Sequence, residues 1–197
     1  MTSTPQAAPN YVSVGGIFID DIVYPDGHTS MEILGGGGVH TCAGIMVWDE
    51  KPGLVATIGL QMPAALLARM NHDFDMQGVL EVPYPQIRAW QLFEWDGKRT
   101  EIFRVEVSAP FMDEPLPEQM PTTYHHAKAV SILRNGSDVA SWRQRFSTDT
   151  IIMWEPEQAY MTADNRADFV ATLPHTQIVS PNLLESACCT ASTIPAR

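Results

Sequence analysis

Four consecutive glycines at positions 35–38 constrain the fold of this chain more than any other feature. Without Cβ atoms, the backbone there can adopt positive φ angles and lets another group approach closely. The run separates a strand-like segment, residues 30–34, from a helix-like segment, residues 39–48. We expect the first N–H groups of that helix to point into the turn, where they favour hydroxyl groups or an anion. The alternative is a purely structural turn before a buried helix.

Length and composition favour one globular α/β domain. The chain has 197 residues, of which 45% are hydrophobic and 18% charged. Its net charge of -11 repels phosphate backbones, so we expect no nucleic-acid partner. No apolar run approaches the roughly 20 residues of a membrane helix, so we expect no membrane partner either. The N-terminus lacks a secretory signal, and three cysteines without ligand spacing suit a reducing compartment, so we expect a cytoplasmic protein.

Strand-like and helix-like segments alternate along most of the chain. We expect strands at residues 11–21, 54–59, 129–133, 150–154 and 177–179, and helices at 39–48, 63–74, 138–146 and 164–173. Such alternation predicts a doubly wound parallel sheet, in which ligands bind beyond the carboxyl ends of the strands. The segment 39–48 is apolar almost all round, which predicts a buried helix.

A different pattern interrupts this alternation. Two strand-like segments, residues 88–94 and 99–107, flank Asp96-Gly97, which is a strong hairpin signal. Charged side chains alternate with apolar ones in the second segment, as in a sheet with one wet face. We expect this hairpin to protrude from the parallel core or to cover its site.

Asp20, near the end of the first predicted strand, is a candidate for binding hydroxyl groups. A carboxylate accepts hydrogen bonds from neighbouring hydroxyls, whereas the alternative is a surface or turn-capping acid. If the strand alternates, either Asp20 or Asp21 points away from the site. His40 is a candidate for a ligand hydrogen bond or a simply packed histidine. Glu155 follows a core strand and is a strand-end acid that could face the site.

Several segments, in order, resemble the ribokinase-like carbohydrate kinases of the PfkB family. The resemblance begins with Gly15-Gly16-Ile17-Phe18-Ile19-Asp20 and continues with the glycine run before a helix and with Ala56-Thr57-Ile58-Gly59. The Asp96-Gly97 hairpin resembles the family's sugar-side lid. Ile178-Val179-Ser180-Pro181-Asn182-Leu183-Leu184-Glu185 is similar to the family's strand followed by P-N-x-x-E.

The resemblance implies a substrate site on the N-terminal side. Asp20 would hold substrate hydroxyls, and Gly35, Gly36 and Gly37 would line the sugar. His40 stands where the family usually has Asn, so one hydroxyl contact would be altered.

The resemblance also implies a phosphate side. Asn182 and Glu185 would act near Mg²⁺ and the phosphates of ATP, the family's cofactors, with no direct metal ligand among them. Without the resemblance, the same pair is an N-cap with a Glu three residues later, worth about 1 kcal/mol of helix stability.

One departure bears on catalysis. The family's second half carries a G-A-G-D segment, which supplies the general base and an anion hole, and nothing in this chain matches it. Gly136-Ser137-Asp138 precedes a predicted helix, so Ser137 or Asp138 is better interpreted as its N-cap. We therefore assign no catalytic residue within the chain.

These features predict a three-layer αβα ribokinase-like fold with a small β lid and without the C-terminal nucleotide-binding part. We expect a lead-in at residues 1–10, a partial kinase-like domain at 11–187 with lid segments near 20–34 and 88–107, and an irregular tail at 188–197. A doubly wound sheet cut in this way leaves an open edge, so we expect self-association through it.

Two functional hypotheses follow. The first is a PfkB-like kinase, whose full-length family transfers phosphate from ATP to a hydroxyl of a sugar or nucleoside-like substrate. The alternative is a truncated, catalytically inactive protein that binds a sugar or another partner. A dinucleotide-binding oxidoreductase is a third option, which the glycine pattern disfavours because no third glycine of G-x-G-x-x-G is present.

Overall fold

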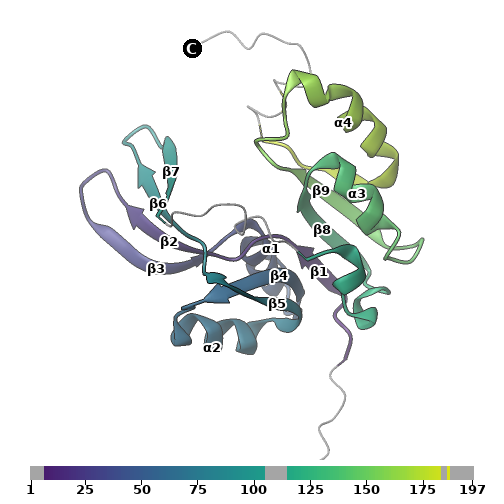
Figure 1. Ribbon diagram of the computed structural model, residues 1–197, viewed down its shortest axis with the longest axis horizontal. Coiled ribbons are helices and arrows are strands. Elements are labelled where there is room, and N and C mark those ends of the chain that lie inside the picture. Colours follow the sequence, from purple (N-terminus) through teal and green to yellow (C-terminus); the bar gives the residue numbers. More distant parts are fainter. Residues whose placement is uncertain (1–6, 105–114, 183–185, 187–197) are drawn as a thin grey trace, which may run out of the picture.

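The computed structural model describes residues 7–104, 115–182 and 186. These residues form a six-stranded sheet flanked by helices and a separate four-stranded sheet that stands beside it (Figure 1). Within the described residues, no helix is long and apolar enough to cross a membrane. The arrangement confirms the predicted three-layer α/β fold with a small β lid.

The main sheet is parallel throughout, as the alternation predicts. Its strand order is β10-β9-β8-β1-β4-β5, and every neighbouring pair is parallel. The strands are β1 (Tyr11–Val14), β4 (Gly53–Leu60), β5 (Asp75–Pro85), β8 (Ala129–Arg134), β9 (Ile151–Pro156) and β10 (Ile178–Val179). From β1 the chain first moves outward to β5 and then returns to β8 on the other side of β1, so the order reverses at β1 and β8.

Helices cover both faces of this sheet. The α-helices are α1 (Gly37–Met46), α2 (Ala64–Asp73), α3 (Gly136–Arg143) and α4 (Arg166–Thr172). Short 3₁₀ segments are η2 (Pro117–Gln119), η3 (Thr122–Tyr124), η4 (Ala163–Asn165) and η5 (Leu173–His175). Helix α1 packs on β1 and β4, α2 on β5, and α3 on β8, β9 and α4.

Alternating strand residues build a separate apolar core on each face. On one side, Val130, Ile132 and Trp154 pack with Trp142 of α3. On the other, Leu54 and its neighbours at every second position pack with α1 and α2. Because successive strand side chains point to opposite faces, continuous apolar strands are needed to fill both cores. Burial of each large side chain stabilises the fold by roughly 1.5–3 kcal/mol.

The second sheet contains the predicted hairpin and two strands from the N-terminal part of the chain. Its strands are β2 (Phe18–Val23), β3 (Thr29–Gly35), β6 (Arg88–Phe93) and β7 (Arg99–Phe103), in the order β3-β2-β6-β7. The β6–β7 hairpin turns at Asp96-Gly97, where Gly97 has a φ of 82°. Residues 105–107 of the predicted second hairpin strand lie outside the described residues.

The predicted first strand, residues 11–21, is wrong as one element. It divides into β1 and β2, which belong to different sheets, so Asp20 lies within β2 and not at the end of the first core strand. Gly15 and Gly16 permit the crossing, because a Cβ on Gly15 would lie 2.7 Å from the backbone nitrogen of Gly38. Gln86 stabilises the junction, since its Nε2 donates to the Ile17 carbonyl at 2.6 Å and its Oε1 accepts from the Gly59 N–H at 2.8 Å.

Two further sequence predictions about helices are wrong. The segment 39–48 is not buried all round, because Val47 and Trp48, just beyond the end of α1, are 77% and 81% exposed. Helix α3 has Asn135 as its N-cap, not Ser137 or Asp138, because the helix starts earlier, at Gly136.

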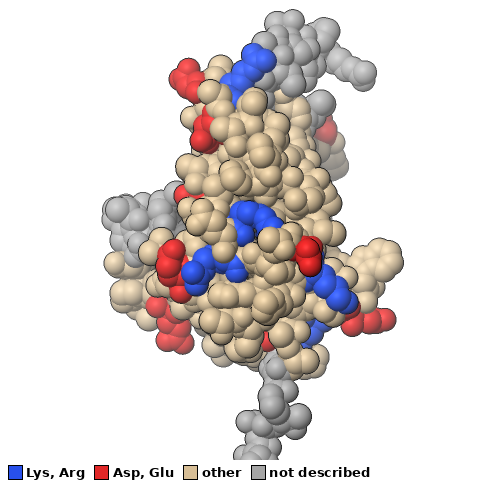
Figure 2. Space-filling model, turned by 90° about the vertical axis from the view of Figure 1, so that its right-hand side faces the viewer, with Lys and Arg blue, Asp and Glu red and all other residues tan. Residues whose placement is uncertain are grey.

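Charged side chains of both signs are interspersed on the face that carries α3 and α4. Figure 2 shows Lys and Arg close to Asp and Glu there, over a largely uncharged surface. That face therefore presents neither a wholly basic nor a wholly acidic patch.

Candidate functional site

A pocket of about 490 Å³ lies between the carboxyl ends of the core strands and the second sheet. Its volume is typical of small-molecule sites. It opens where the strand order reverses, which is where ligands bind in doubly wound sheets. The polar and aromatic lining comprises Phe18, Asp20, His40, Thr57, Gln91, Arg99, Glu101, Phe103, Arg134, Glu155 and Glu157, together with backbone at Gly15, Gly16, Gly36 and Gly37.

The glycine run shapes one wall of this pocket. Gly36 has a φ of 96°, and a Cβ there would lie 2.4 Å from the Gly16 carbonyl oxygen. Gly36 is also the N-cap of α1, which has no side-chain cap and no acidic residue in its first turn. The Gly38 N–H donates to the Gly16 carbonyl at 3.2 Å, so this donor does not point freely into the turn.

Gly35 contributes differently from its neighbours, because it makes room for Asp20. A Cβ on Gly35 would lie 2.0 Å from Asp20 Oδ2. A side chain at position 35 would therefore displace the carboxylate. Gly35 therefore contacts Asp20 and is not among the pocket-lining residues, whereas Gly36 and Gly37 line the pocket.

Asp20 is the most enclosed carboxylate of the pocket, with 8% of its surface exposed. Burial raises the pKa of Asp20, the hydrogen bond from Gln91 opposes the rise, and the charge of Glu101 adds to it. The charges of His40 and Arg99 also lower this pKa. The predicted site residues Asp20, Gly36, Gly37 and His40 thus line one pocket, with His40 on its exposed rim.

Several lining residues were not identified from the sequence. Gln91, Arg99 and Glu101 come from the hairpin, on alternating positions of its inner face. Arg134, at the end of β8, is 3% exposed, and its guanidinium donates to the Leu133 carbonyl at 2.7 Å. The sequence signal for Arg134 was a cation ending an apolar strand.

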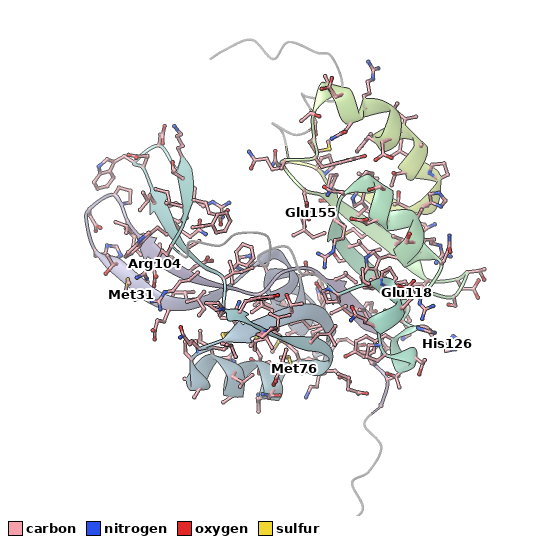
Figure 3. All side chains as sticks on the ribbon, in the orientation of Figure 1. Met31, Met76, Arg104, Glu118, His126 and Glu155 are labelled. Atoms are coloured by element: carbon pink, nitrogen blue, oxygen red, sulfur yellow. The ribbon has the colours of Figure 1, made fainter. Side chains whose placement is uncertain are left out.

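Two acids of the pocket lie at the end of β9: Glu155 within the strand and Glu157 just after it. Glu155 lies on the side of β9 that faces the second sheet (Figure 3) and lines the pocket. Burial raises the pKa of Glu157, while the charge of Arg134 opposes this rise. A buried arginine and two acids therefore border the pocket opposite Asp20.

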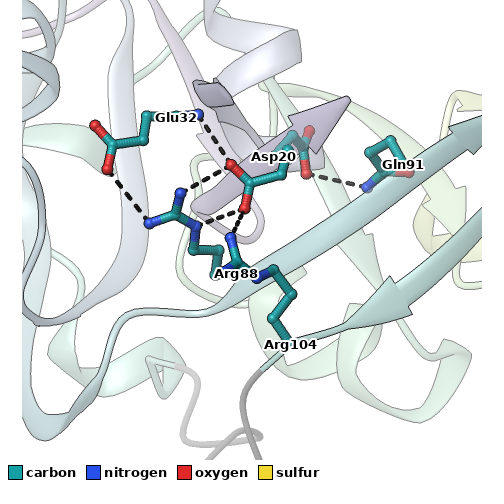
Figure 4. A network of polar contacts seen from close by, with 6 residues as sticks. Asp20, Glu32, Arg88, Gln91 and Arg104 are labelled. Carbon is teal, nitrogen blue, oxygen red and sulfur yellow. Dashed lines mark hydrogen bonds and ion pairs between the residues drawn. The ribbon is translucent and has the colours of Figure 1, made fainter. Parts of the chain in front are cut away.

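Asp21 follows Asp20 on β2, so its side chain lies on the other face of the strand, where it holds the second sheet together. Figure 4 shows its partners Glu32, Arg88 and Arg104. Its fully buried carboxylate accepts from Arg88 Nε at 2.6 Å and Nη2 at 2.8 Å, from Arg104, and from the Glu32 N–H at 3.0 Å. Arg104 also stacks over the Trp90 ring, 4.5 Å from its centroid. One carboxylate thus links β2, β3, β6 and the residue after β7, which fixes the strand that carries Asp20.

The predicted phosphate-side pair is only partly described. Asn182 follows β10, and its carbonyl accepts from the Ser186 N–H at 2.9 Å, the spacing of a helical turn. Asn182 is not among the pocket-lining residues, and Glu185 lies outside the described residues. In the described part of the chain, no cluster of three or more His, Cys, Asp or Glu side chains is arranged to hold a metal ion.

Comparison with known proteins shows a ribokinase-like fold. No family model matches the sequence. The chain is 23% identical over 195 residues to uncharacterized protein C16C9.01c of Schizosaccharomyces pombe, covering 93% of this chain and 53% of that protein. The chain therefore spans about half the length of the curated relative it matches.

The similar solved structures include kinases, one of which is described as an archaeal member of the ribokinase family. A nucleoside kinase of Methanocaldococcus jannaschii matches with a TM-score of 0.66 and 13% identity, over 94% of this chain and 65% of that one. A putative ribokinase II of E. coli in complex with ATP and Mg²⁺ matches with a TM-score of 0.70 and 15% identity, over 94% of this chain and 66% of that one. A nucleoside kinase of Burkholderia thailandensis in complex with inosine matches with a TM-score of 0.67 and 12% identity, over 93% of this chain and 64% of that one.

Proposed function

We propose that this chain binds a small polyhydroxylated compound, a sugar or the ribose of a nucleoside, in the pocket between its two sheets. The observation that carries the proposal is the enclosed Asp20 carboxylate, for which Gly35 leaves room and beside which Gly36 and Gly37 line the wall. Sugar hydroxyls are hydrogen-bond donors, and a carboxylate accepts from two of them at once.

The remaining lining suits the same class of ligand. Phe18 and Phe103 pack edge to face, with ring centroids 6.1 Å apart, and provide an apolar wall for the C–H groups of a sugar ring. Acids and bases around the rim, including Glu101 and Arg99, offer both acceptors and donors. A pocket that mixes apolar surface with a few polar groups both holds and orients a small ligand.

We further propose that the whole protein is a kinase-like phosphotransferase that uses ATP and Mg²⁺ and a hydroxyl acceptor. This proposal is supported by the fold, by the pocket at the strand-order reversal and by the similar proteins solved with inosine and with ATP and Mg²⁺. Asn182 and Glu185 are the residues we propose for the Mg²⁺ and phosphate side.

The described residues do not by themselves fit a magnesium–nucleotide site. They contain no metal-binding cluster, and the chain has no G-A-G-D segment to supply a general base. We therefore assign binding of the hydroxyl compound, and not phosphoryl transfer, to these 197 residues. The second candidate function, an inactive protein that binds a sugar, is favoured by this same observation.

Calorimetry with ribose, fructose and inosine tests the binding proposal. We expect Asp20→Asn to weaken binding about tenfold to a hundredfold, because a hydrogen bond to a charged group contributes roughly 1.5–3 kcal/mol. The exposed acid Asp149 provides a matched control, since Asp149→Asn changes the net charge equally but lies outside the pocket lining. Equal binding by the Asp20→Asn variant and the unchanged protein would contradict the proposal. ATP-dependent phosphorylation by the chain alone would exclude the inactive alternative.

A further inference from the structure

The amide of Gln91 connects two carboxylates of the pocket. Its Nε2 atom donates to Asp20 Oδ1 at 3.0 Å and to Glu101 Oε1 at 2.7 Å (Figure 4 shows the first bond). A primary amide has two N–H groups, and here both are directed at carboxylates. Gln91 is 4% exposed, whereas Glu101 is exposed.

Strand register explains why these three side chains meet. Gln91 and Glu101 are directly paired across the antiparallel β6–β7 hairpin. In the parallel β2–β6 pair, Asp20 lies opposite Ala89, two residues from Gln91, so all three face the pocket. The opposite face of β2 is fixed by Asp21, which holds Arg88 and Arg104. Asp20 is thus carried by a strand whose other face is held by the bonds of Asp21.

The orientation of the Gln91 amide follows from the two charges. A reversed amide would place its oxygen against both carboxylates, which is electrostatically unfavourable. In the observed orientation, the Oε1 atom is buried and has no hydrogen-bond partner among the described residues. Such an unsatisfied acceptor costs about 1–3 kcal/mol, so the two bonds to the carboxylates must outweigh that cost.

We propose that Gln91 is a positioning residue, which joins Asp20 and Glu101 into one acceptor pair for two adjacent hydroxyl groups of the ligand. The pair brings a hairpin residue, Glu101, to the same hydroxyl compound that Asp20 binds. The ligand part of this inference rests on the proposed function, whereas the positioning of Asp20 does not.

The ionisation of Asp20 responds to the same contacts. The hydrogen bond from Gln91 lowers the pKa of Asp20, and the charge of Glu101 raises it. The other charged groups that affect this carboxyl are His40 of α1 and Arg99 of β7, and both lower the pKa. Substitutions at Gln91 and Glu101 are therefore expected to shift the pKa in opposite directions.

The first test needs no ligand. The Asp20 carboxyl carbon is titrated by NMR in the unchanged protein and in three variants. We expect Gln91→Leu to raise the pKa of Asp20 and Glu101→Gln to lower it. Gln86→Leu also removes a buried glutamine, but one bonded only to backbone, so it is expected to leave this pKa unchanged. An unchanged pKa in Gln91→Leu, or the same shift in Gln86→Leu, would overturn the proposal. Because Glu101 is exposed, Glu101→Gln remains informative if Gln91→Leu does not fold.

The second test compares ribose with 2-deoxyribose by calorimetry. One additional hydrogen bond to a carboxylate corresponds to a preference of about tenfold for ribose. We expect Gln91→Leu and Glu101→Gln to lose most of this preference and Asp149→Asn to keep it. A preference that persists in both pocket variants would overturn the acceptor pair and leave the proposed function intact. If the pKa shifts occur but neither sugar binds, the proposed function fails, while the positioning of Asp20 by Gln91 stands.

Discussion

Replacing Asp21 with Asn tests whether one buried carboxylate holds the second sheet together. Asn keeps the shape of the side chain and removes the charge that Arg88 and Arg104 contact. Burial raises the pKa of Asp21, but the bonds from Arg88, the Glu32 N–H and Arg104 outweigh this, and the pKa falls to about 2.

The pKa gives the size of the expected effect. A fall from 3.8 to about 2 corresponds to about 2.5 kcal/mol of stability, at 1.36 kcal/mol per pKa unit. Removing one partner of a fully buried pair costs about 3–5 kcal/mol. Here the side chains of Arg88 and Arg104 are 25% and 33% exposed, so water partly replaces the carboxylate as a partner of their guanidinium groups. We expect Asp21→Asn to lower the free energy of unfolding by about 2–3 kcal/mol.

Urea unfolding followed by tryptophan fluorescence measures this difference. The lowered pKa means that Asp21 stabilises the fold fully above about pH 4, the ordinary range of an aspartate, and progressively less as the pH falls to about 2. The unchanged protein and the Asp21→Asn variant should therefore converge in stability near pH 2. A loss below about 0.5 kcal/mol at pH 7, or one equal to that of Asp149→Asn, would show that Asp21 does not hold the second sheet together.

Three further predictions concern the glycine wall, the pH dependence of binding and the exposed apolar surface. Gly35→Ala should abolish ribose binding and lower the melting temperature, because its Cβ would meet Asp20 Oδ2. Gly44→Ala, in open space on α1, should instead stabilise the protein by about 0.5–1 kcal/mol. Calorimetry and thermal unfolding compare the two variants. Ribose affinity should fall on acidification at a higher pH than an ordinary aspartate would cause, because burial raises the pKa of Asp20 and protonation removes an acceptor; calorimetry from pH 7 to 4 measures this. We expect concentration-dependent self-association in sedimentation velocity, reduced by Trp48→Lys and Ile151→Lys, because these side chains are 81% and 46% exposed.

The parallel architecture was predictable because its signals are local. Apolar strands alternate with helices, and the Asp96-Gly97 turn identified the hairpin that the structure confirms. The break between β1 and β2 was harder to predict, because residues 11–19 are mostly apolar and contain no charged residue. Only Gly15-Gly16 signalled it, and their role depends on the approach of Gly38, which lies far away in sequence.

Strand β5 was missed for a different reason. Its 11 residues include Pro83 and Pro85, which disfavour a strand prediction. The structure places β5 at the edge of the sheet, where missing N–H donors are tolerated. Sequence patterning alone does not distinguish such an edge strand from a loop.

Only some of the pocket residues could be identified from the sequence. The candidates Asp20 and His40 were accessible from the sequence, because Asp20 lies near the end of the first predicted strand and His40 closely follows the glycine run. Gln91 and Glu101 were not, because strand pairing in the second sheet brings them to Asp20 from distant parts of the chain, and Arg134 was not, because it reaches the pocket from the main sheet. The glycine run itself combines two roles, since Gly36 needs its positive φ and Gly35 makes room for a carboxylate.

An NMR titration with ribose and inosine shows whether these compounds bind beside Asp20 and the glycine wall. We expect the amide signals of Gly36, Gly37 and His40 to shift, together with the signal of the Asp20 carboxyl carbon. In Asp20→Asn, the amide shifts should need about tenfold to a hundredfold more ligand, as expected for the loss of a hydrogen bond to a charged group. Binding that shifts amide signals elsewhere and leaves these four residues unchanged would show that the ligand binds outside this pocket.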